Sequence, residues 1–172
     1  YDMCFTVFNM PCAFMVPITT SVLPAITALL TTKNFDGAKA TEESAARITG
    51  LISLPCAVGL SILATPVISL LGGYTGDNLI LAGKILAILG VNIFFYATIQ
   101  YTNVVLQSHG YAHIPVINTL LCGGVKLAVV YVLVGNPQIG IVGAPIGMAL
   151  CYLCIGVMNL IAINRVVPHK PR

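Results

Sequence analysis

The sequence predicts an all-α integral membrane protein, and three observations lead to this fold class. First, 58% of the 172 residues are hydrophobic and only 8% are charged, whereas soluble domains carry about 25% charged residues. Second, each of the stretches without Asp, Glu, Lys or Arg exceeds the roughly 20 residues that cross a ~30 Å hydrocarbon layer. These stretches are residues 3–30, 48–76, 85–125 and 127–164. Third, they are apolar on all sides, unlike the alternating ~10-residue strands of a membrane β-barrel.

The charges and turn residues divide the chain into about five transmembrane helices within a single domain, 1–172. The predicted spans are 3–30, 48–71, 79–107, 114–134 and 141–164. The connector at 31–47 is the one segment of soluble character, and we expect a short helix there that lies on the membrane surface. Asp36 is its expected N-cap, and Glu43 with Arg47 has the spacing of an i,i+4 ion pair.

The distribution of basic residues predicts the orientation of the spans. The connector 31–47, the turn 108–113 and the tail 165–172 fall on one side and hold most of the Lys and Arg, whereas Lys84 stands on the other. Because basic loops stay in the cytoplasm, these segments are predicted to be cytoplasmic. We expect His109 and the neighbouring His113 to be solvated turn residues.

Composition and motifs argue against several other classes of protein. The net charge of +3 lies in connecting segments and does not indicate nucleic-acid binding. The six cysteines lie in apolar runs, where a thiol acts as a small hydrophobe, and Cys151-x-x-Cys154 lacks the second pair of a metal site. The sequence contains no nucleophile–base–acid set and no phosphate-binding loop, so we expect no enzyme activity, cofactor or metal. Because the chain begins with Tyr1 and lacks a signal-peptide pattern, we expect an internal fragment of a longer protein.

Polar residues form a stripe on two of the predicted spans. On the third span, five of them fall within about 80° of one helix face: Asn92, Tyr96, Gln100, Asn103 and Gln107. A weaker stripe on the first span comprises Asp2, Thr6, Asn9, Thr20, Pro24 and Thr27. Two interpretations stand side by side. The stripes join helices through hydrogen bonds of about 0.6–2 kcal/mol each, or they form the wall of a hydrated passage.

Lys126 is the single most informative residue because it lies near the middle of the fourth span. An ionised side chain at that depth costs about 2.5–3.5 kcal/mol, and no span offers a carboxylate partner. We therefore expect Lys126 to face water, a polar cavity or an anionic ligand such as a phosphate, with snorkelling toward an interface as the alternative. Gly143-x-x-x-Gly147 on the fifth span predicts a helix-packing surface.

Several strings in the chain resemble a known family. They are FNMPCAFMVPITTSVLPAITALL, ITGLISLPCAVGLSILATPVISLLGG, VVLQSHGYAHIPVINTLLCGGVKLAVVYVLV and GIVGAPIGMAL. The most specific string is Leu106-Gln107-x-x-Gly110-x-x-x-x-Pro115-x-x-Asn118. Together they resemble the polysaccharide-biosynthesis flippases of the multidrug/oligosaccharidyl-lipid/polysaccharide exporter superfamily, in particular the stage V sporulation protein B-like group and the lipid II flippases. Lys126 matches a lysine that recurs in these proteins.

The resemblance implies a transporter of two helix bundles around a central cavity, of which this chain would form most of the second bundle. The implied function is the movement of a lipid-linked oligosaccharide or polysaccharide precursor across the cytoplasmic membrane by alternating access. Its partners would be the lipid-linked sugar phosphate, membrane lipids and the missing N-terminal bundle. The candidate substrate-binding residues that line the cavity are Lys126, Asn92, Gln100, Asn103, Asn9 and Asn118.

Two alternatives to this function stay open at the level of the sequence. A cation-coupled multidrug extruder of the same superfamily would bind a cationic drug and would need carboxylates in its cavity. A non-transporting membrane scaffold would use the polar stripes only to join helices.

Overall fold

The computed structural model describes residues 1–73, 76–135 and 140–166, and this part of the chain is helical apart from its turns. Its elements in chain order are α1 (Asp2–Thr31), α2 (Phe35–Ile62), α3 (Ala64–Gly72), α4 (Asp77–Ser108), α5 (His113–Val134), the 3-10 turn η1 (Gly140–Val142) and α6 (Gly143–Val166). Within the described residues, five helical segments are long and apolar enough to cross a membrane. The predicted fold class, all-α with five spans, is confirmed.

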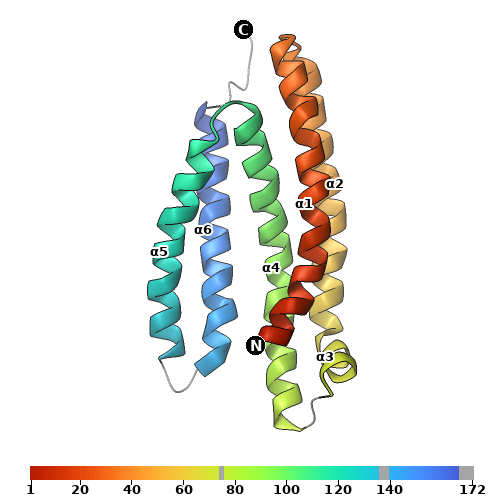
Figure 1. Ribbon diagram of the computed structural model, residues 1–172, viewed down its shortest axis with the longest axis vertical. Coiled ribbons are helices and arrows are strands. Elements are labelled where there is room, and N and C mark those ends of the chain that lie inside the picture. The colour runs from red at the N-terminus through yellow and green to blue at the C-terminus, as the bar shows by residue number, and fades with distance from the viewer. Residues whose placement is uncertain (74–75, 136–139, 167–172) are drawn as a thin grey trace.

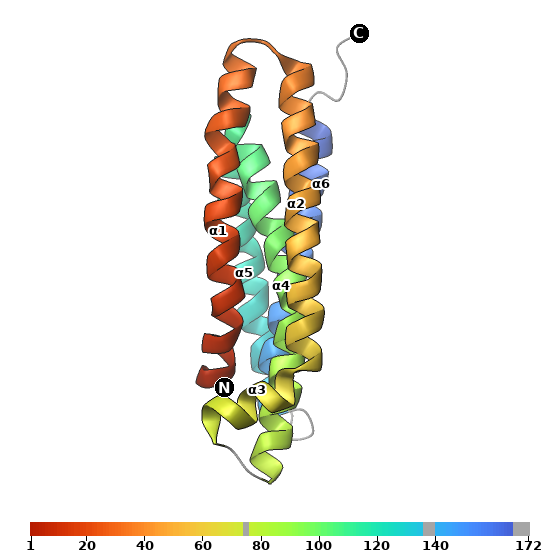
Figure 2. The ribbon, with the colours of Figure 1, turned by 90° about the vertical axis from the view of Figure 1, so that its right-hand side faces the viewer.

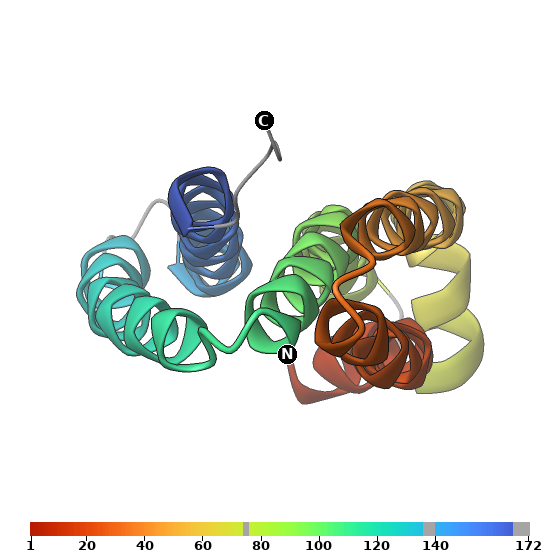
Figure 3. The same ribbon diagram turned by 90° about the horizontal axis from the view of Figure 1, so that it is seen from above.

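The long helices run up and down beside one another, with α4 at the centre (Figure 1). Helices α1 and α2 pack on one side of α4 and α6 packs on the other, while α5 packs mainly on α6. The view from above shows that α1 and α5 flank α4 on opposite sides (Figure 3). The α1–α2 and α4–α5 turns lie at the same end of the molecule.

The core lies along α4 and consists of apolar side chains from nearly every helix. Its largest fully buried members include Phe8 of α1, Ile68 of α3 and Leu86 and Leu89 of α4, each at most 1% exposed. Glycines let the helices approach closely. A Cβ on Gly90 would lie 2.8 Å from the backbone nitrogen of Ser61 in α2, so α2 and α4 are nearly in backbone contact there.

The connector before the second span is not a separate surface helix, so this expectation is wrong. Helix α2 begins at Phe35 and runs unbroken to Ile62 (Figure 2). The segment is rich in Ala, Glu and Lys, which favour helix, and it contains no residue that would end one at the membrane boundary. The expected N-cap at Asp36 is also wrong. Asn34 is the N-cap, and its side-chain oxygen accepts a hydrogen bond from the Gly37 amide at 3.0 Å.

The predicted span 48–71 is instead broken at Leu63, where α2 ends and the short helix α3 turns crosswise (Figure 2). Pro66 favours the break, although Pro55 stays inside the unbroken α2. In a continuous helix its missing N–H would leave the Ile62 carbonyl without a partner, and its ring would clash with that carbonyl. Near the beginning of α3, the missing N–H of Pro66 costs nothing, because the first N–H groups of a helix have no carbonyl partner within that helix. The predicted span 48–71 is therefore one long helix followed by a short one.

Candidate functional site

The polar stripe of α1 lies on the outward face of the helix. Each member is exposed, and so is Ala13 between them; the members are Asp2, Thr6, Asn9, Thr20, Pro24 and Thr27. The hydroxyls are bonded to their own helix: Thr6 Oγ1 donates to the Asp2 carbonyl at 2.9 Å, and Thr20 and Thr27 donate to carbonyls one turn back at 2.8 Å. With their donors satisfied locally, these hydroxyls present acceptor lone pairs along one face, next to the Asn9 amide.

The stripe of α4 is divided between two surroundings, beginning with Asn92 at the α4–α6 contact. Asn92 is 0% exposed, and its Nδ2 donates to the Pro145 carbonyl of α6 at 3.1 Å. Its Oδ1 has no hydrogen-bond partner within the described part of the chain. Further along, Gln100 is half-buried and its Nε2 donates to the hydroxyl of Tyr96 on the same helix at 3.3 Å.

A buried polar cluster joins three helices around Asn159 of α6, which is 0% exposed. Its Oδ1 accepts a hydrogen bond from Asn118 Nδ2 of α5 at 2.8 Å. Its Nδ2 donates to Asn103 Oδ1 and Thr102 Oγ1 of α4, at 2.8 and 3.2 Å. The oxygen and the amide nitrogen of the Asn159 side chain therefore both form hydrogen bonds to other helices. We call these residues, Asn159, Asn118, Asn103 and Thr102, the asparagine cluster.

The sequence interpretation missed Asn159, although a signal for it exists. The packing face of α6 that begins at Gly143 and Gly147 continues in steps of four through Cys151 and Ile155 to Asn159. The glycines are in close contact with α5: a Cβ on Gly147 would lie 2.7 Å from Val130 Cγ2. The predicted packing surface is confirmed, and an amide at its end had to meet a polar partner on a neighbouring helix.

Of the six predicted cavity residues, three have amides engaged between helices: Asn92, Asn103 and Asn118. Hydrogen bonding between helices was one of the two interpretations of the stripe, and it describes these side chains as they stand. Asn9 is exposed on α1 and Gln100 is half-buried on α4. That any of them lines a passage stays a prediction.

Lys126 lies on the face of α5 that meets α6. It borders a cavity of about 200 Å³ whose other walls are apolar or sulfur-bearing, among them Cys122, Cys151, Cys154 and Met158. Among the described residues, the one contact within 4.0 Å between a basic and an acidic side chain joins His109 and Glu42, so Lys126 has no carboxylate partner there. Because α1 and α5 lie on opposite sides of α4, Lys126 is not beside the α1 stripe. The lysine and the stripe are two separate features.

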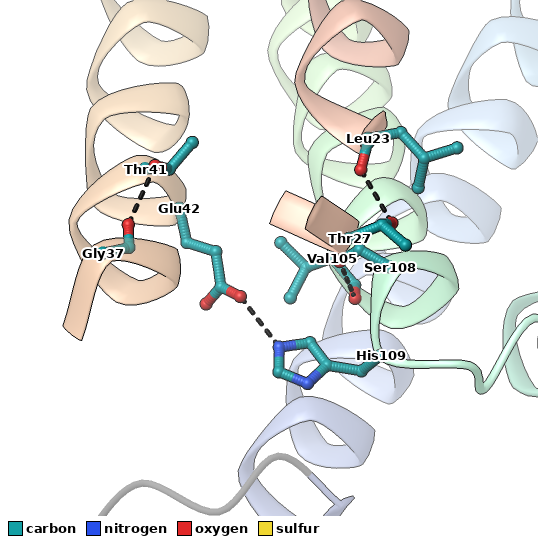
Figure 4. Close-up of polar contacts among 8 residues, drawn as sticks. All are labelled: Leu23, Thr27, Gly37, Thr41, Glu42, Val105, Ser108 and His109. Carbon is teal, nitrogen blue, oxygen red and sulfur yellow. Dashed lines mark hydrogen bonds and ion pairs between the residues drawn. The ribbon is translucent and has the colours of Figure 1, made fainter. Parts of the chain in front are cut away.

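His109 is not a solvated turn residue, contrary to expectation. Its Nε2 lies 2.8 Å from Glu42 Oε1 of α2, and the two side chains are only 14% and 15% exposed. Figure 4 shows the imidazole at the end of α4 reaching across to the carboxylate, with Ser108 bonded to the Val105 carbonyl beside it. His113, by contrast, is exposed. The Glu42–His109 contact ties the first turns of α2 to the α4–α5 turn, which no local pattern indicated.

Comparison with known proteins identifies the family of this chain. A family model described as "Lipid II flippase MurJ" matches residues 4–171, nearly the whole chain. No curated protein and no solved structure matches. The family description names a flippase of a lipid-linked precursor, which is a membrane transporter and not an enzyme. The predicted resemblance to lipid-linked oligosaccharide flippases is therefore confirmed, and its five apolar helices and its family identify the chain as a multi-pass membrane protein.

Proposed function

The chain belongs to the lipid II flippase MurJ family, and from this premise we propose that it forms one wall of a passage through which a lipid-linked oligosaccharide headgroup crosses the membrane by alternating access. The physical task is to move a polar, phosphate-bearing headgroup across a ~30 Å apolar layer. The lipid tail can stay in the bilayer throughout, so the protein has to shield only the headgroup.

One observation carries the proposal: the exposed polar stripe of α1. Of the helices at the edge of this bundle, α1 presents Asn9 with a row of threonine oxygens outward. The outward residues of α5 are instead mostly apolar, including Leu120 and Leu127, which are 72% and 74% exposed. An exposed amide such as that of Asn9 is unfavourable among acyl chains, because polar side chains in the membrane need a polar or wet neighbour. We therefore assign the α1 face to the headgroup passage, completed by the missing N-terminal bundle, and the α5 face to lipid.

The proposed orientation of the helices in the membrane follows from the distribution of basic residues. In the proposed topology, residues 31–47, the turn 108–113 and the C-terminal tail are cytoplasmic, so α1 enters from the outside and α6 ends inside. Residues 167–172 of the tail lie outside the described residues. The substrate is loaded at the end of α1 near Thr27 and released near Asp2.

Lys126 supplies the cation in this proposal. Its ammonium has no carboxylate partner within 4.0 Å in the described residues, and an ammonium is a point charge suited to a phosphate. Lys126 is separated from the α1 stripe by α4. We therefore propose that Lys126 and the stripe do not contact the same part of the substrate at the same stage of transport. Of the predicted cavity residues, Asn9 and Lys126 are the ones on which this function depends most.

Cysteine accessibility tests the proposal in the full-length protein. Single cysteines replace Asn9 and Thr20 on the stripe, with Leu120 and Leu127 of α5 as matched exposed controls. A membrane-impermeant thiol reagent in water should label the two α1 positions, and substrate should protect them, while the α5 positions stay unlabelled. Equal silence at all four positions would indicate a scaffold without a passage.

A further inference from the structure

Helix α3 is a short apolar helix that leaves the line of the bundle. It runs crosswise at the end opposite the α1–α2 turn (Figure 2). Its inner edge is well packed, with Ala64 2% and Ile68 0% exposed. Its outer edge is open: Leu70 is 86% exposed, and Ile62, just before α3, is 74% exposed. A stable soluble surface does not concentrate such side chains on one short helix.

The length of α2 places α3 at the boundary of the membrane. Arg47 is the last charged residue of α2. From Ile48 to Ile62 the helix rises only about 22 Å, at ~1.5 Å per residue, which is less than the ~30 Å hydrocarbon thickness. The chain therefore turns at Leu63 before it has left the bilayer, and α3 begins within it or at its edge.

The contact with α4 fixes the same level from the other side. A Cβ on Gly83 would lie 2.7 Å from Thr65 Oγ1, so the first turn of α3 touches α4 at Gly83. The next residue is Lys84, which is exposed. A lysine near the end of a membrane helix places its ammonium among the headgroups. Helix α3 thus lies at headgroup depth.

The two flanks of α3 differ in polarity, as expected for a helix at the boundary between headgroups and acyl chains. With about 100° per residue, Thr65 and Ser69 fall within about 40° of each other, and Pro66 and Leu70 fall on a separate flank roughly 100° away. Each of these four residues is exposed. One flank can meet water and headgroups while the other meets acyl chains, as in helices that lie in the interface.

We propose that α3 is an interfacial anchor whose Leu70 flank inserts among lipid acyl chains, in the leaflet opposite the α1–α2 and α4–α5 turns. The occupant of this apolar surface is the bilayer itself. The proposal does not depend on the passage at α1, so it stands or falls separately from the transport mechanism. Its consequence is that the membrane end of α2 is held at a fixed depth.

The test uses full-length protein in phospholipid nanodiscs. In a cysteine-free background, an environment-sensitive fluorophore is attached at Leu70→Cys, with Ser69→Cys as the adjacent control. The label at position 70 should be quenched several-fold more by lipids brominated on the acyl chain than the label at 69, and aqueous iodide should give the reverse order. Quenching of the label at 70 by iodide as strongly as at 69 would overturn the proposal.

A second variant keeps the natural cysteines, in case their removal prevents folding. The sequence contains no tryptophan, so Leu70→Trp adds a fluorophore that is read as the difference from the parent protein. A blue-shifted emission that brominated lipids quench supports the anchor. If neither brominated lipids nor iodide quench the added tryptophan, other protein covers α3 and the proposal is wrong.

Discussion

The polar side chains of α1 and those of the α4–α5–α6 side are placed in opposite ways. On α1 the polar stripe faces outward, with Asn9 exposed. On the other side the amides face one another, and Asn159 is completely buried among Asn118, Asn103 and Thr102. The comparison shows that a polar stripe in a membrane helix has two distinct uses. An inward stripe joins helices, whereas an outward one needs a wet or polar neighbour.

Lys126 belongs to neither group of polar side chains, and its removal has the largest expected effect. We expect Lys126→Ala to abolish transport in the full-length protein while membrane insertion stays intact, because Lys126 is the one charged side chain among the described residues that line its cavity. Lys126→Arg, which keeps the charge, is the matched control. Transport is measured as appearance of the lipid-linked headgroup in the outer leaflet. Normal transport by the alanine variant would remove Lys126 from the mechanism.

Asn159→Leu tests whether the inward-facing amides stabilise the helix bundle. It removes three hydrogen bonds and leaves Asn118, Asn103 and Thr102 without their partner. At about 0.6 kcal/mol for each membrane hydrogen bond, the free energy of unfolding should fall by roughly 2 kcal/mol. Unfolding of the full-length protein in mixed micelles measures it. Asn164→Leu, at an exposed position of the same helix, should change stability by less than about 0.5 kcal/mol.

Two substitutions compare a buried amide of α4 with an exposed amide of α1. Asn92→Ala removes a buried amide that is bonded to the Pro145 carbonyl, and we expect a loss of about 1 kcal/mol in stability. Asn9→Ala removes an exposed amide, so its stability should change by less than about 0.5 kcal/mol while transport falls. The two variants are compared by the same unfolding and transport assays. A loss of stability at Asn9 equal to that at Asn92 would contradict the outward assignment of α1.

The smallest expected effect is at the Glu42–His109 contact. A double-mutant cycle of Glu42→Gln and His109→Gln should give a coupling energy of about 0.5–1 kcal/mol, since partly exposed ion pairs contribute little. The cycle is measured by unfolding at constant pH and salt. Zero coupling would mean that the contact at 2.8 Å does not help to hold α2 on α4.

Periodicity and charge were enough to predict the five spans and the existence of a polar stripe on α1, because both are properties of one helix at a time; that this stripe faces outward came from the structure. The partners of each face were not predictable in the same way. Glu42 and His109 are 67 positions apart, and nothing in either segment indicates the other. The α4 stripe was visible as a pattern, but whether it meets α6 or water depends on how helices pack. Pro66 has no donor for the Ile62 carbonyl, but Pro55 lies inside α2 without ending it, so a proline alone did not locate the break at Leu63.

The continuity of α2 across its charged and apolar parts has a mechanical consequence. Its 28 residues form a rod of about 42 Å, which is longer than the ~30 Å hydrocarbon layer. The first turns therefore project beyond the bilayer, and the helix continues without interruption where Arg47 gives way to Ile48. A displacement of these projecting turns is therefore carried directly into the apolar part of the same helix, as far as Pro55.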